Sequence, residues 1–337
     1  MIPHNIPTLG VEEKCAAERV IASGRVAQGP EVEAFENELC RFLNIPEGHA
    51  LAVSSGSAAL YLALWVLRGN NKRIGLPVYT CSSLRNAVHL VNGQVVYLDC
   101  AKGSPNLDVS VANSANIDIL IAASMFGIPV ELPAKRSFKL IEDISQSLGA
   151  TISGKKIGLR GEIGVCSFYA TKMMTSGGQG GAVFSYDKTF IDILKDYREF
   201  DSRHDEMARF NFQMTDLQAA IGRVQLRKMP LFVKKRERIF DCYQSSGLSM
   251  LDSISPASHS VRYRAVMRSD DPSEVIRSLK ANGVRAIVPI EKQELSENLS
   301  LYPMALNLAG TTVSLPCYPN LSEKEAMSIA RTLKKHL

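Results

Sequence analysis

Two side chains that could act together on a carbonyl compound follow apolar runs near the middle of the sequence. Asp143 lies in KLIEDIS at 139–145, and Lys172 comes just after VCSFYA at 165–170. Open α/β sheets bind ligands at the carboxyl ends of their strands, so both side chains are predicted to lie in such a place. A lysine amine can form an imine with an aldehyde, and a carboxylate can keep a pyridine nitrogen protonated so that the ring accepts electrons. Each residue taken singly is more often a surface lysine or a helix-capping aspartate.

A second candidate feature is the turn SSGSA at 54–58, which ends one apolar run and leads directly into a helical pattern. Backbone NH groups and the helix dipole make such a turn favourable for a phosphate. Many α/β crossovers have a similar turn without a ligand. The turn alone therefore leaves both interpretations open.

Several other motifs fail. GATISGKK at 149–156 is close to a nucleotide-binding loop, but Lys156 stands where Ser or Thr would hold magnesium and no helix follows, so a glycine-rich hairpin is favoured. The sequence has no dinucleotide-binding glycine motif and no serine-hydrolase elbow. Its six histidines include no HxxxH or HExxH pair, and its seven cysteines include no CxxC. We therefore predict no metal site and no disulfide framework.

The elements that must position these residues are indicated by seven short apolar runs. Runs of this length are typical of strands buried on both faces, and helical patterns such as 57–67 lie between several of them. The alternation predicts an α/β fold, a three-layer αβα sandwich around a mostly parallel seven-stranded sheet. The runs span 49–55, 74–77, 94–99, 117–124, 139–145, 165–170 and 181–187.

The pattern changes near residue 230. A long amphipathic helix is predicted from about Pro230 to Ser245, followed by a smaller α+β part. The predicted domains are residues 1–229, a large domain that holds the candidate site residues, and residues 230–337, a small C-terminal domain with its connecting helix. The signals in the small domain are the alternation of Val261, Tyr263, Ala265 and Met267, the helix start at Asp271-Pro272, and the capping box of Ser322 and Glu325.

Composition excludes few partners. The net charge is +5, and basic residues crowd the stretch 227–238. We predict the exposed side of an amphipathic helix there rather than a nucleic-acid site, because no recognition motif accompanies it. No apolar run is long enough to cross a membrane and no secretory signal is found, so a cytoplasmic protein is expected. The basic side comprises Arg227, Lys228, Lys234, Lys235, Arg236 and Arg238, and the apolar side comprises Leu231, Phe232, Ile239 and Tyr243.

Taken together, DISQSLGA at 143–150, SFYATK at 167–172 and GGQGGAV at 177–183 resemble the paired signature of the DegT/StrS-type sugar aminotransferases. These are fold type I enzymes that use pyridoxal 5′-phosphate (PLP) and act on nucleotide-linked keto sugars. The similarity covers almost the whole chain. Further matches, in the same order, are VAQGPEVEAFE at 26–36, SSGSAALYLAL at 54–64, RFNFQMTDLQAAIGRVQL at 209–226 and LPCYP at 315–319.

The resemblance implies a role for each matching residue. Lys172 would carry PLP as a Schiff base, Asp143 would pair with the pyridinium nitrogen, and Gln146 would approach the ring hydroxyl. Asn211 would reach the phosphate bound by a second subunit, which implies a homodimer. The residues assigned to the cofactor phosphate are Gly56, Ser57, Ala58 and Ser167.

The chain also departs from the family pattern. Cys81 stands where the family usually stacks an aromatic ring on PLP, Ser124 where a histidine is frequent, and Gln213 where an arginine is common. The segment IVPIEKQELSEN at 287–298 lacks the familiar PLH stretch. Because these changes surround the expected substrate pocket, the acceptor and the position aminated are not defined by the sequence.

The resulting hypothesis is a PLP-dependent aminotransferase that moves an amino group from an amino acid, such as glutamate, to a keto sugar linked to a nucleotide. In this hypothesis Lys172 forms an aldimine with PLP and, once released, is close to neutral and moves a proton. The dehydratases of the family normally have histidine at the lysine position, so Lys172 argues against that reaction. A degenerate member with a regulatory or interaction role, or an enzyme with another acceptor, is the alternative.

Overall fold

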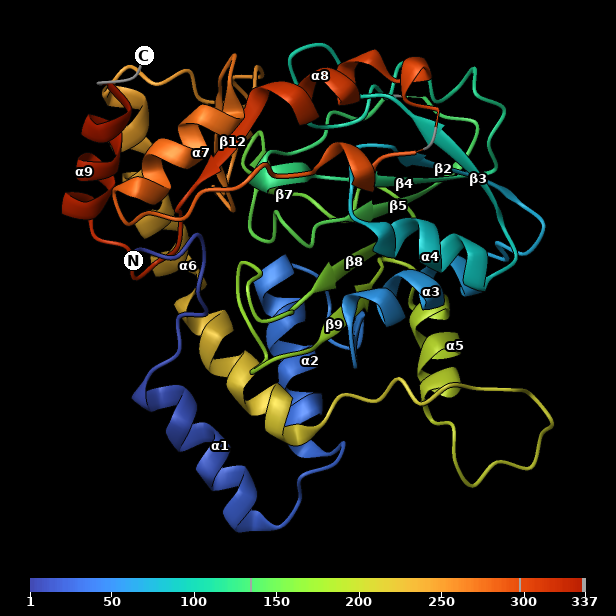
Figure 1. The fold of residues 1–337 in the computed structure, drawn as a ribbon. Coiled ribbons are helices and arrows are strands. Elements are labelled where there is room, and N and C mark those ends of the chain that lie inside the picture. The colour runs from blue at the N-terminus through green and yellow to red at the C-terminus, as the bar shows by residue number, and fades with distance from the viewer. Residues whose placement is uncertain (134, 297, 335–337) are drawn as a thin grey trace.

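The structure is a computed structural model that describes residues 1–133, 135–296 and 298–334, and its centre is the predicted seven-stranded sheet (Figure 1). The strand order is β1-β9-β8-β5-β4-β2-β3. Only β9 runs antiparallel to its neighbours, so the sheet is mostly parallel as predicted. The strands are β1 (Ala50–Val53), β2 (Arg73–Pro77), β3 (Gln94–Leu98), β4 (Ile119–Ala123), β5 (Lys139–Asp143), β8 (Ile163–Ser167) and β9 (Gly181–Phe184).

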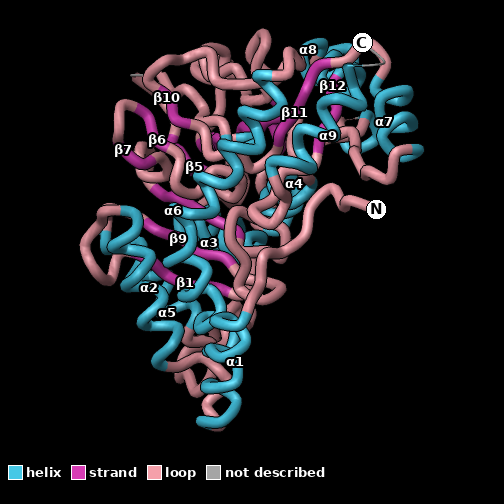
Figure 2. Tube along the Cα trace, turned by 90° about the vertical axis from the view of Figure 1, so that its left-hand side faces the viewer, coloured by secondary structure: helices cyan, strands magenta, loops and turns pink. Residues whose placement is uncertain are grey.

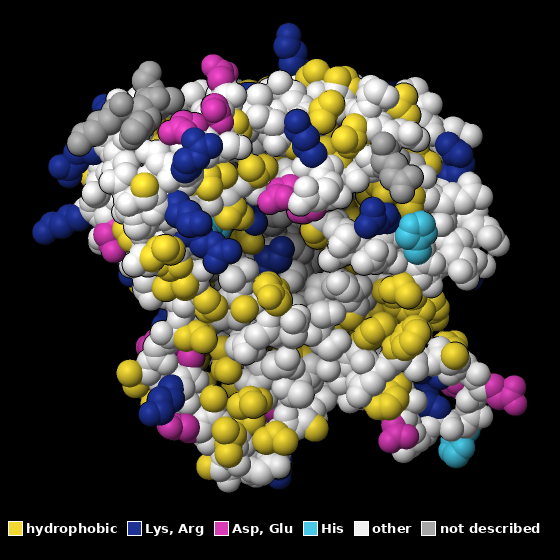
Figure 3. Space-filling model, viewed as in Figure 1, with side chains coloured by type: hydrophobic (Ala, Val, Ile, Leu, Met, Phe, Trp, Pro, Cys, Tyr) yellow, Lys and Arg dark blue, Asp and Glu magenta, His cyan; other side chains and the backbone are white. Residues whose placement is uncertain are grey.

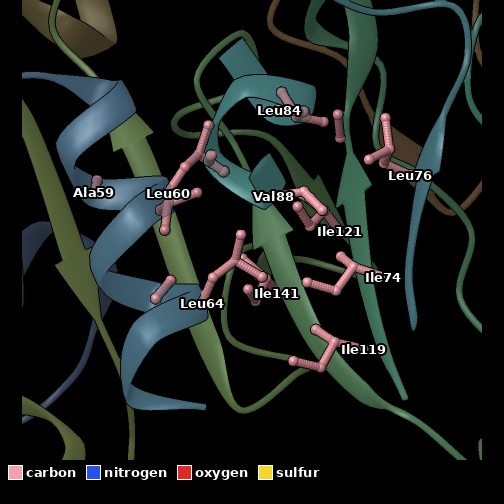
Figure 4. Close-up of a cluster of buried hydrophobic side chains, with 14 of the residues drawn as sticks. Ala59, Leu60, Leu64, Ile74, Leu76, Leu84, Val88, Ile119, Ile121 and Ile141 are labelled. Carbon is pink, nitrogen blue, oxygen red and sulfur yellow. The ribbon is translucent and has the colours of Figure 1, made fainter. Parts of the chain in front are cut away.

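Burial on both faces explains why these runs are almost continuously apolar. All five residues of β4 are buried. Successive side chains of a strand point to opposite faces, so Ile119 and Ile121 join one core while Leu120 and Ala122 join another. Figure 4 shows the first of these cores, where Leu60 and other side chains of helix α3 lie against the isoleucines of the central strands.

Helices cover both faces, which confirms the αβα sandwich. Helices α3 (Gly56–Val66), α4 (Ser82–Leu90) and α5 (Lys188–Arg198) pack on one face. Helix α2 (Pro30–Leu43) and the first half of α6 (Asp216–Ser245) pack on the other face. Buried side chains of loop residues, among them Leu107, Ala112 and Val130, cover the rest of that face near β3 and β4. The predicted helix at 57–67 is therefore confirmed as α3.

Helix α6 begins at Asp216 rather than near Pro230. Thr215 caps it, because its hydroxyl accepts the Gln218 NH and the Gln218 side chain accepts the Thr215 NH. A proline inside a helical pattern usually indicates a helix end, which explains the late predicted start. Here Pro230 lies exposed within a continuous helix. The predicted domain boundary at 229/230 thus falls inside α6 and stays a prediction.

The C-terminal part has a core of its own. Strands β11 (Ala265–Arg268) and β12 (Thr312–Leu315) pair antiparallel beside α7 (Pro272–Ala281) and α9 (Glu323–Lys334). The buried side chains of α8 (Pro303–Thr311) join the core of the large sheet instead. The start of the chain joins this part, since Ile2 pairs with Val284, and α1 (Val11–Ser23) then packs on α6 (Figure 2). The predicted caps at Asp271 and Ser322 are confirmed, whereas residues 335–337 lie outside the described residues.

Short elements complete the chain. Strands β6 (Thr151–Ile152) and β7 (Lys155–Lys156) form the predicted hairpin in place of a nucleotide loop, and β10 (Ser258–His259) extends it. Three 3-10 turns are η1 (Met125–Gly127), η2 (Lys292–Glu294) and η3 (Leu299–Leu301). In the described ranges, no helix is long and apolar enough to cross a membrane.

The basic stretch of α6 is less regular than predicted. Arg236 is buried rather than on the exposed side, because its guanidinium donates to the carbonyls of Tyr263 and Cys317. Leu231, assigned to the apolar side, is exposed. The remaining pattern holds, since Phe232, Ile239 and Tyr243 are buried.

Candidate active site

A cavity of about 280 Å³ lies where several strands end at one edge of the sheet. Strands β1, β2, β4, β5 and β8 run in one direction, so their carboxyl ends meet at this edge. Figure 3 shows a hollow near the middle of the face drawn, with basic side chains gathered beside it. Seven of the predicted site residues line the cavity: Gly56, Ser57, Cys81, Asp143, Gln146, Ser167 and Lys172.

Asp143 is fixed in the cavity wall at the end of β5. Its side chain is buried, and Oδ1 accepts the Ser145 NH at 2.8 Å. Its backbone carbonyl accepts the Ser124 NH from the neighbouring strand end at 3.0 Å. These bonds orient the carboxylate, and its neighbour Glu142 points away and pairs with Arg160.

Lys172 follows β8 and is half-buried in the same wall. Burial of its amine lowers the pKa, but electrostatic interactions with Tyr263, Cys81 and Asp143 outweigh burial, so the pKa lies above the usual lysine value. The expectation that the amine released from the cofactor is close to neutral stays a prediction.

The predicted phosphate turn is present, but one of its backbone NH groups already donates a hydrogen bond within the protein. Ser55 caps α3, and its hydroxyl accepts the Ala58 NH at 3.1 Å. Ala58 is buried and does not line the cavity, whereas Ser57 is exposed to it. A Cβ on Gly56 would lie 2.6 Å from Cβ of Ser167, so the glycine is needed where these two segments meet. The turn and Ser167 thus form one small polar cradle beside Asp143 and Lys172.

Gln146 and Ser124 line the cavity and hold the backbone of the loop after β4. Oε1 of Gln146 accepts the Phe126 NH at 2.8 Å, and the Ser124 hydroxyl accepts the Val130 NH at 3.0 Å. Phe126 has a φ of 60°, in the left-handed region, within the turn η1. Ser124 therefore has a backbone-holding role in the loop after β4, and both it and Gln146 face the cavity.

Cys81 and Asn211 differ in their placement. Cys81 is the exposed residue before α4 and lines the cavity. Asn211 does not, because it lies exposed in the long loop between α5 and α6, which projects from the body of the molecule in Figure 1. Its Oδ1 accepts the Gln213 NH at 3.0 Å. Within one chain, Asn211 and Gln213 are not brought to the cavity.

Tyr263 is a site residue that sequence reasoning missed. It is buried, and Nζ of Lys172 lies 5.6 Å from its ring centre. Burial raises its pKa, but Lys172, Arg264 and Arg236 outweigh burial, so the pKa lies below the usual tyrosine value. The sequence analysis identified Tyr263 only as one residue of a predicted strand with alternating apolar positions. In the structure β11 starts at Ala265, and Tyr263 precedes it in a segment that passes beside the lysine.

The cavity also includes Thr80, Tyr169 and Gln179, which the sequence did not single out. Tyr169 and Gln179 fall within segments that carry the family resemblance, so position in those segments was the only signal. Among the described residues, no group of three or more histidine, cysteine or acidic side chains could hold a metal ion. All seven cysteines are free.

An open α/β sheet that directs a lysine and a carboxylate into one cavity at its strand ends is suited to amino-group transfer. The family model named "DegT/DnrJ/EryC1/StrS aminotransferase family" matches residues 7–334. The chain belongs to this family and is an aminotransferase.

Similar proteins include a sugar transaminase and a protein of erythromycin biosynthesis. The chain is 28% identical to the "dTDP-3-amino-3,4,6-trideoxy-alpha-D-glucose transaminase" of Streptomyces venezuelae, over 97% of this chain and 92% of that protein. It is also 28% identical to the "Erythromycin biosynthesis sensory transduction protein EryC1" of Saccharopolyspora erythraea, over 95% and 93%.

Solved structures share the fold. Streptomyces venezuelae DesV "in complex with ketimine intermediate" has a TM-score of 0.89 at 26% identity, covering 98% of both chains. The "putative sugar aminotransferase Spr1654" of Streptococcus pneumoniae, in its "PLP-form", has a TM-score of 0.90 at 21% identity, covering 99% of this chain and 98% of that chain.

Proposed function

We propose that this protein is a PLP-dependent aminotransferase that moves an amino group from an amino acid donor, such as glutamate, to a keto sugar linked to a nucleotide. The observation that carries the proposal is that Asp143 and Lys172 line one cavity at the carboxyl ends of β5 and β8. The amino-sugar transaminases among the similar proteins support the choice of acceptor.

The described residues fit the cofactor. The cradle of Gly56, Ser57 and Ser167 would hold its phosphate, because helix α3 begins there and directs its N-terminus into the cavity. Asp143 would face the ring nitrogen, and Gln146 would face the ring hydroxyl. When bound, PLP supplies an aldehyde that takes up an amine and a pyridinium ring that accepts an electron pair from the substrate carbon.

Within this arrangement Lys172 would have two tasks. Its amine would hold the cofactor aldehyde between turnovers, and once a donor amine has replaced it, the same amine would be placed to take up the proton that leaves the donor Cα and to give it back. The carboxylate of Asp143 would lie beside the ring nitrogen and would stabilise the protonated ring.

The proposal is tested with the purified protein and added PLP. We expect a visible absorption band that L-glutamate removes and that a nucleotide-linked keto sugar restores in the pyridoxamine form. Screening such keto sugars would then identify the acceptor. A protein that gives no band with PLP would contradict the proposal and would favour the regulatory alternative.

Replacing Cys81 by tyrosine is predicted to strengthen cofactor binding. Cys81 lines the cavity at the position where an aromatic ring is usual in the family, and stacking contributes about 0.5–1.5 kcal/mol, or roughly 2- to 10-fold in affinity. Titration of the apo-protein with PLP, followed by fluorescence, would measure the change. The control is Cys15→Tyr at another exposed cysteine, on α1. An unchanged or lower affinity for Cys81→Tyr would show that this position does not face the ring.

We propose further that the enzyme is a homodimer in which Asn211 completes the site of the partner subunit. Asn211 is exposed on the projecting loop and does not line the cavity of its own chain. The neighbouring Phe210 is also exposed, although it packs against Tyr61 and Phe212. An apolar side chain at the root of a long loop is consistent with a partner surface there.

Mixed dimers provide the corresponding prediction. Lys172→Ala and Asn211→Ala proteins should each have little activity at limiting PLP. A hybrid of the two has one intact site if Asn211 acts across the interface, so refolding an equimolar mixture should restore about a quarter of wild-type activity. No recovery, with hybrid formation verified by two affinity tags, would indicate that Asn211 acts within its own chain or has no role.

A further inference from the structure

Lys172 lines a second, much smaller cavity as well as the active-site cavity. The volume of this second cavity is about 10 Å³, which is at the lower limit for holding one water molecule. Three parts of the chain form its walls. Thr8 belongs to the N-terminal segment, Lys172 and Thr175 to the segment after β8, and Gln225 and Arg236 to helix α6.

Two residues of this small cavity each carry a buried polar atom that has no hydrogen-bond partner among the described residues. These atoms are Nε of Arg236 and Oγ1 of Thr8. Arg236 as a whole is 2% exposed, so bulk water does not reach its guanidinium. A buried polar atom without a partner is costly, and ordered water is the usual partner where the protein provides none. Two such atoms at one cavity therefore indicate a bound ligand.

The existing hydrogen bonds of Arg236 leave its Nε in need of an acceptor. Its Nη1 donates to the carbonyl of Tyr263 at 3.1 Å and to the carbonyl of Cys317. Within residues 1–133, 135–296 and 298–334, Arg236 forms no ion pair, whereas Arg238 on the same helix pairs with Glu323. The acceptor for Nε must therefore be an oxygen that no neighbouring carboxylate supplies.

Other polar groups of the cavity suit a water molecule. Oγ1 of Thr175 accepts the Gly177 NH at 3.1 Å, and Oε1 of Gln225 accepts the Thr175 NH at 3.4 Å. Each of these oxygens has a second lone pair, so each can accept a further hydrogen bond. A water that accepts from Arg236 and bonds Thr8 thus has acceptors for its own protons. A cation would be repelled by the guanidinium, and a chloride ion is larger than a water molecule.

The same cavity joins the N-terminal segment to the segment that carries the active-site lysine. Nδ2 of Asn5 donates to the carbonyl of Thr171 at 3.0 Å. Nε2 of Gln225 donates to the carbonyl of Thr8 at 2.8 Å, while its Oε1 holds the backbone of the segment after β8. A water between Thr8 and helix α6 adds a further connection at the point where these segments meet.

We propose that this cavity binds one ordered water molecule, which bridges Nε of Arg236 and Oγ1 of Thr8 and helps to fix residues 170–175 around Lys172. The water is a structural ligand and takes no part in making or breaking bonds. The inference goes beyond the proposed function and does not depend on it, because the site is present in the protein without cofactor.

A high-resolution crystal structure of the apo-protein tests the site directly. We expect one peak of water density within about 3.2 Å of both Nε of Arg236 and Oγ1 of Thr8. An anomalous peak at this place after a bromide soak would identify an anion and overturn the assignment. A closed cavity, in which Arg236 and Thr8 bond other protein groups directly, would overturn it as well.

Removal of the Thr8 hydroxyl tests the role of the water in solution. Thr8→Val keeps the shape of the side chain but takes one partner from the water. The melting temperature of the apo-protein should therefore fall by about 2–4 °C. Amide hydrogen exchange in the peptide that contains residues 170–175 should become about 3- to 10-fold faster. Thr8→Ser keeps the hydroxyl, so both quantities should stay close to their wild-type values.

The matched control is Thr189→Val. Thr189 is an exposed threonine near the start of α5 and does not line the cavity, so this variant should match the wild type in both measurements. A wild-type melting temperature and exchange rate in Thr8→Val would overturn the proposal, and so would an equal effect of Thr8→Ser. Faster exchange confined to the N-terminal peptide would contradict the proposed effect on residues 170–175.

Discussion

Lys172→Ala is expected to abolish the visible absorption of added PLP and to lower the rate of donor deamination by a factor of about 10³ or more. The factor combines loss of the covalent attachment with loss of the proton-transferring amine, which alone typically contributes 10²–10⁴-fold. Absorption spectra and single-turnover reactions with glutamate would measure both effects. Retention of either the band or the deamination rate would exclude Lys172 from the assigned role.

Lys156 provides a matched control for this variant. Burial lowers the pKa of Lys156, so judged by pKa alone its amine is more reactive than that of Lys172. Its Nζ lies 4.0 Å from the centre of the Phe42 ring, however, and Lys156 does not line the active-site cavity. Lys156→Ala should keep the visible band and the deamination rate. Comparing the two variants therefore shows whether the position of a lysine in the cavity or its low pKa determines the reaction with PLP.

Asp143→Asn is expected to bind PLP but to lower kcat for the donor half-reaction by about 10²- to 10⁴-fold. The amide keeps the shape of the side chain and can accept the Ser145 NH, but it carries no charge to stabilise a protonated ring nitrogen. Single-turnover rates with glutamate at saturating PLP would show the loss. A variant with wild-type kcat would contradict the pairing of Asp143 with the ring.

A substitution at the adjacent residue, Glu142, is expected to change the stability of the protein and not its catalytic rate. Glu142 points away from the cavity, where its carboxylate accepts Arg160 and the Gly158 NH. Glu142→Gln should lower the melting temperature, because a buried charge partner is weakened, while the folded fraction keeps its kcat. A loss of kcat in Asp143→Asn and a loss of stability in Glu142→Gln would together confirm that these neighbouring side chains of β5 point to opposite faces of the sheet.

Local patterns predicted the sheet well because its strands are short, apolar and buried on both faces. All seven runs became strands, and the turn before α3 formed with Ser55 as its cap. The same alternation of strands and helices placed Asp143 and Lys172 at one edge. These features depend on neighbours within the sequence or on a regular topology, so one sequence is enough to predict them.

Features that depend on long-range contacts were missed. The fully buried Arg236 looks like a solvent-exposed residue in its basic stretch, because the carbonyls that bind it come from residues 263 and 317. Tyr263 reaches Lys172 only because the segment before β11 crosses to the cavity. The raised pKa of Lys172 depends in part on this contact, which joins residues far apart in sequence and so could not be predicted from local patterns.

The most direct test of the account is to locate the bond between cofactor and protein. The PLP-loaded protein is reduced with borohydride, digested, and analysed by mass spectrometry. We expect a pyridoxyl group on Nζ of Lys172 in the peptide that contains SFYATK, and no such group in a control digest of the unloaded protein. Modification of a different lysine, or none in a protein that binds PLP, would contradict it.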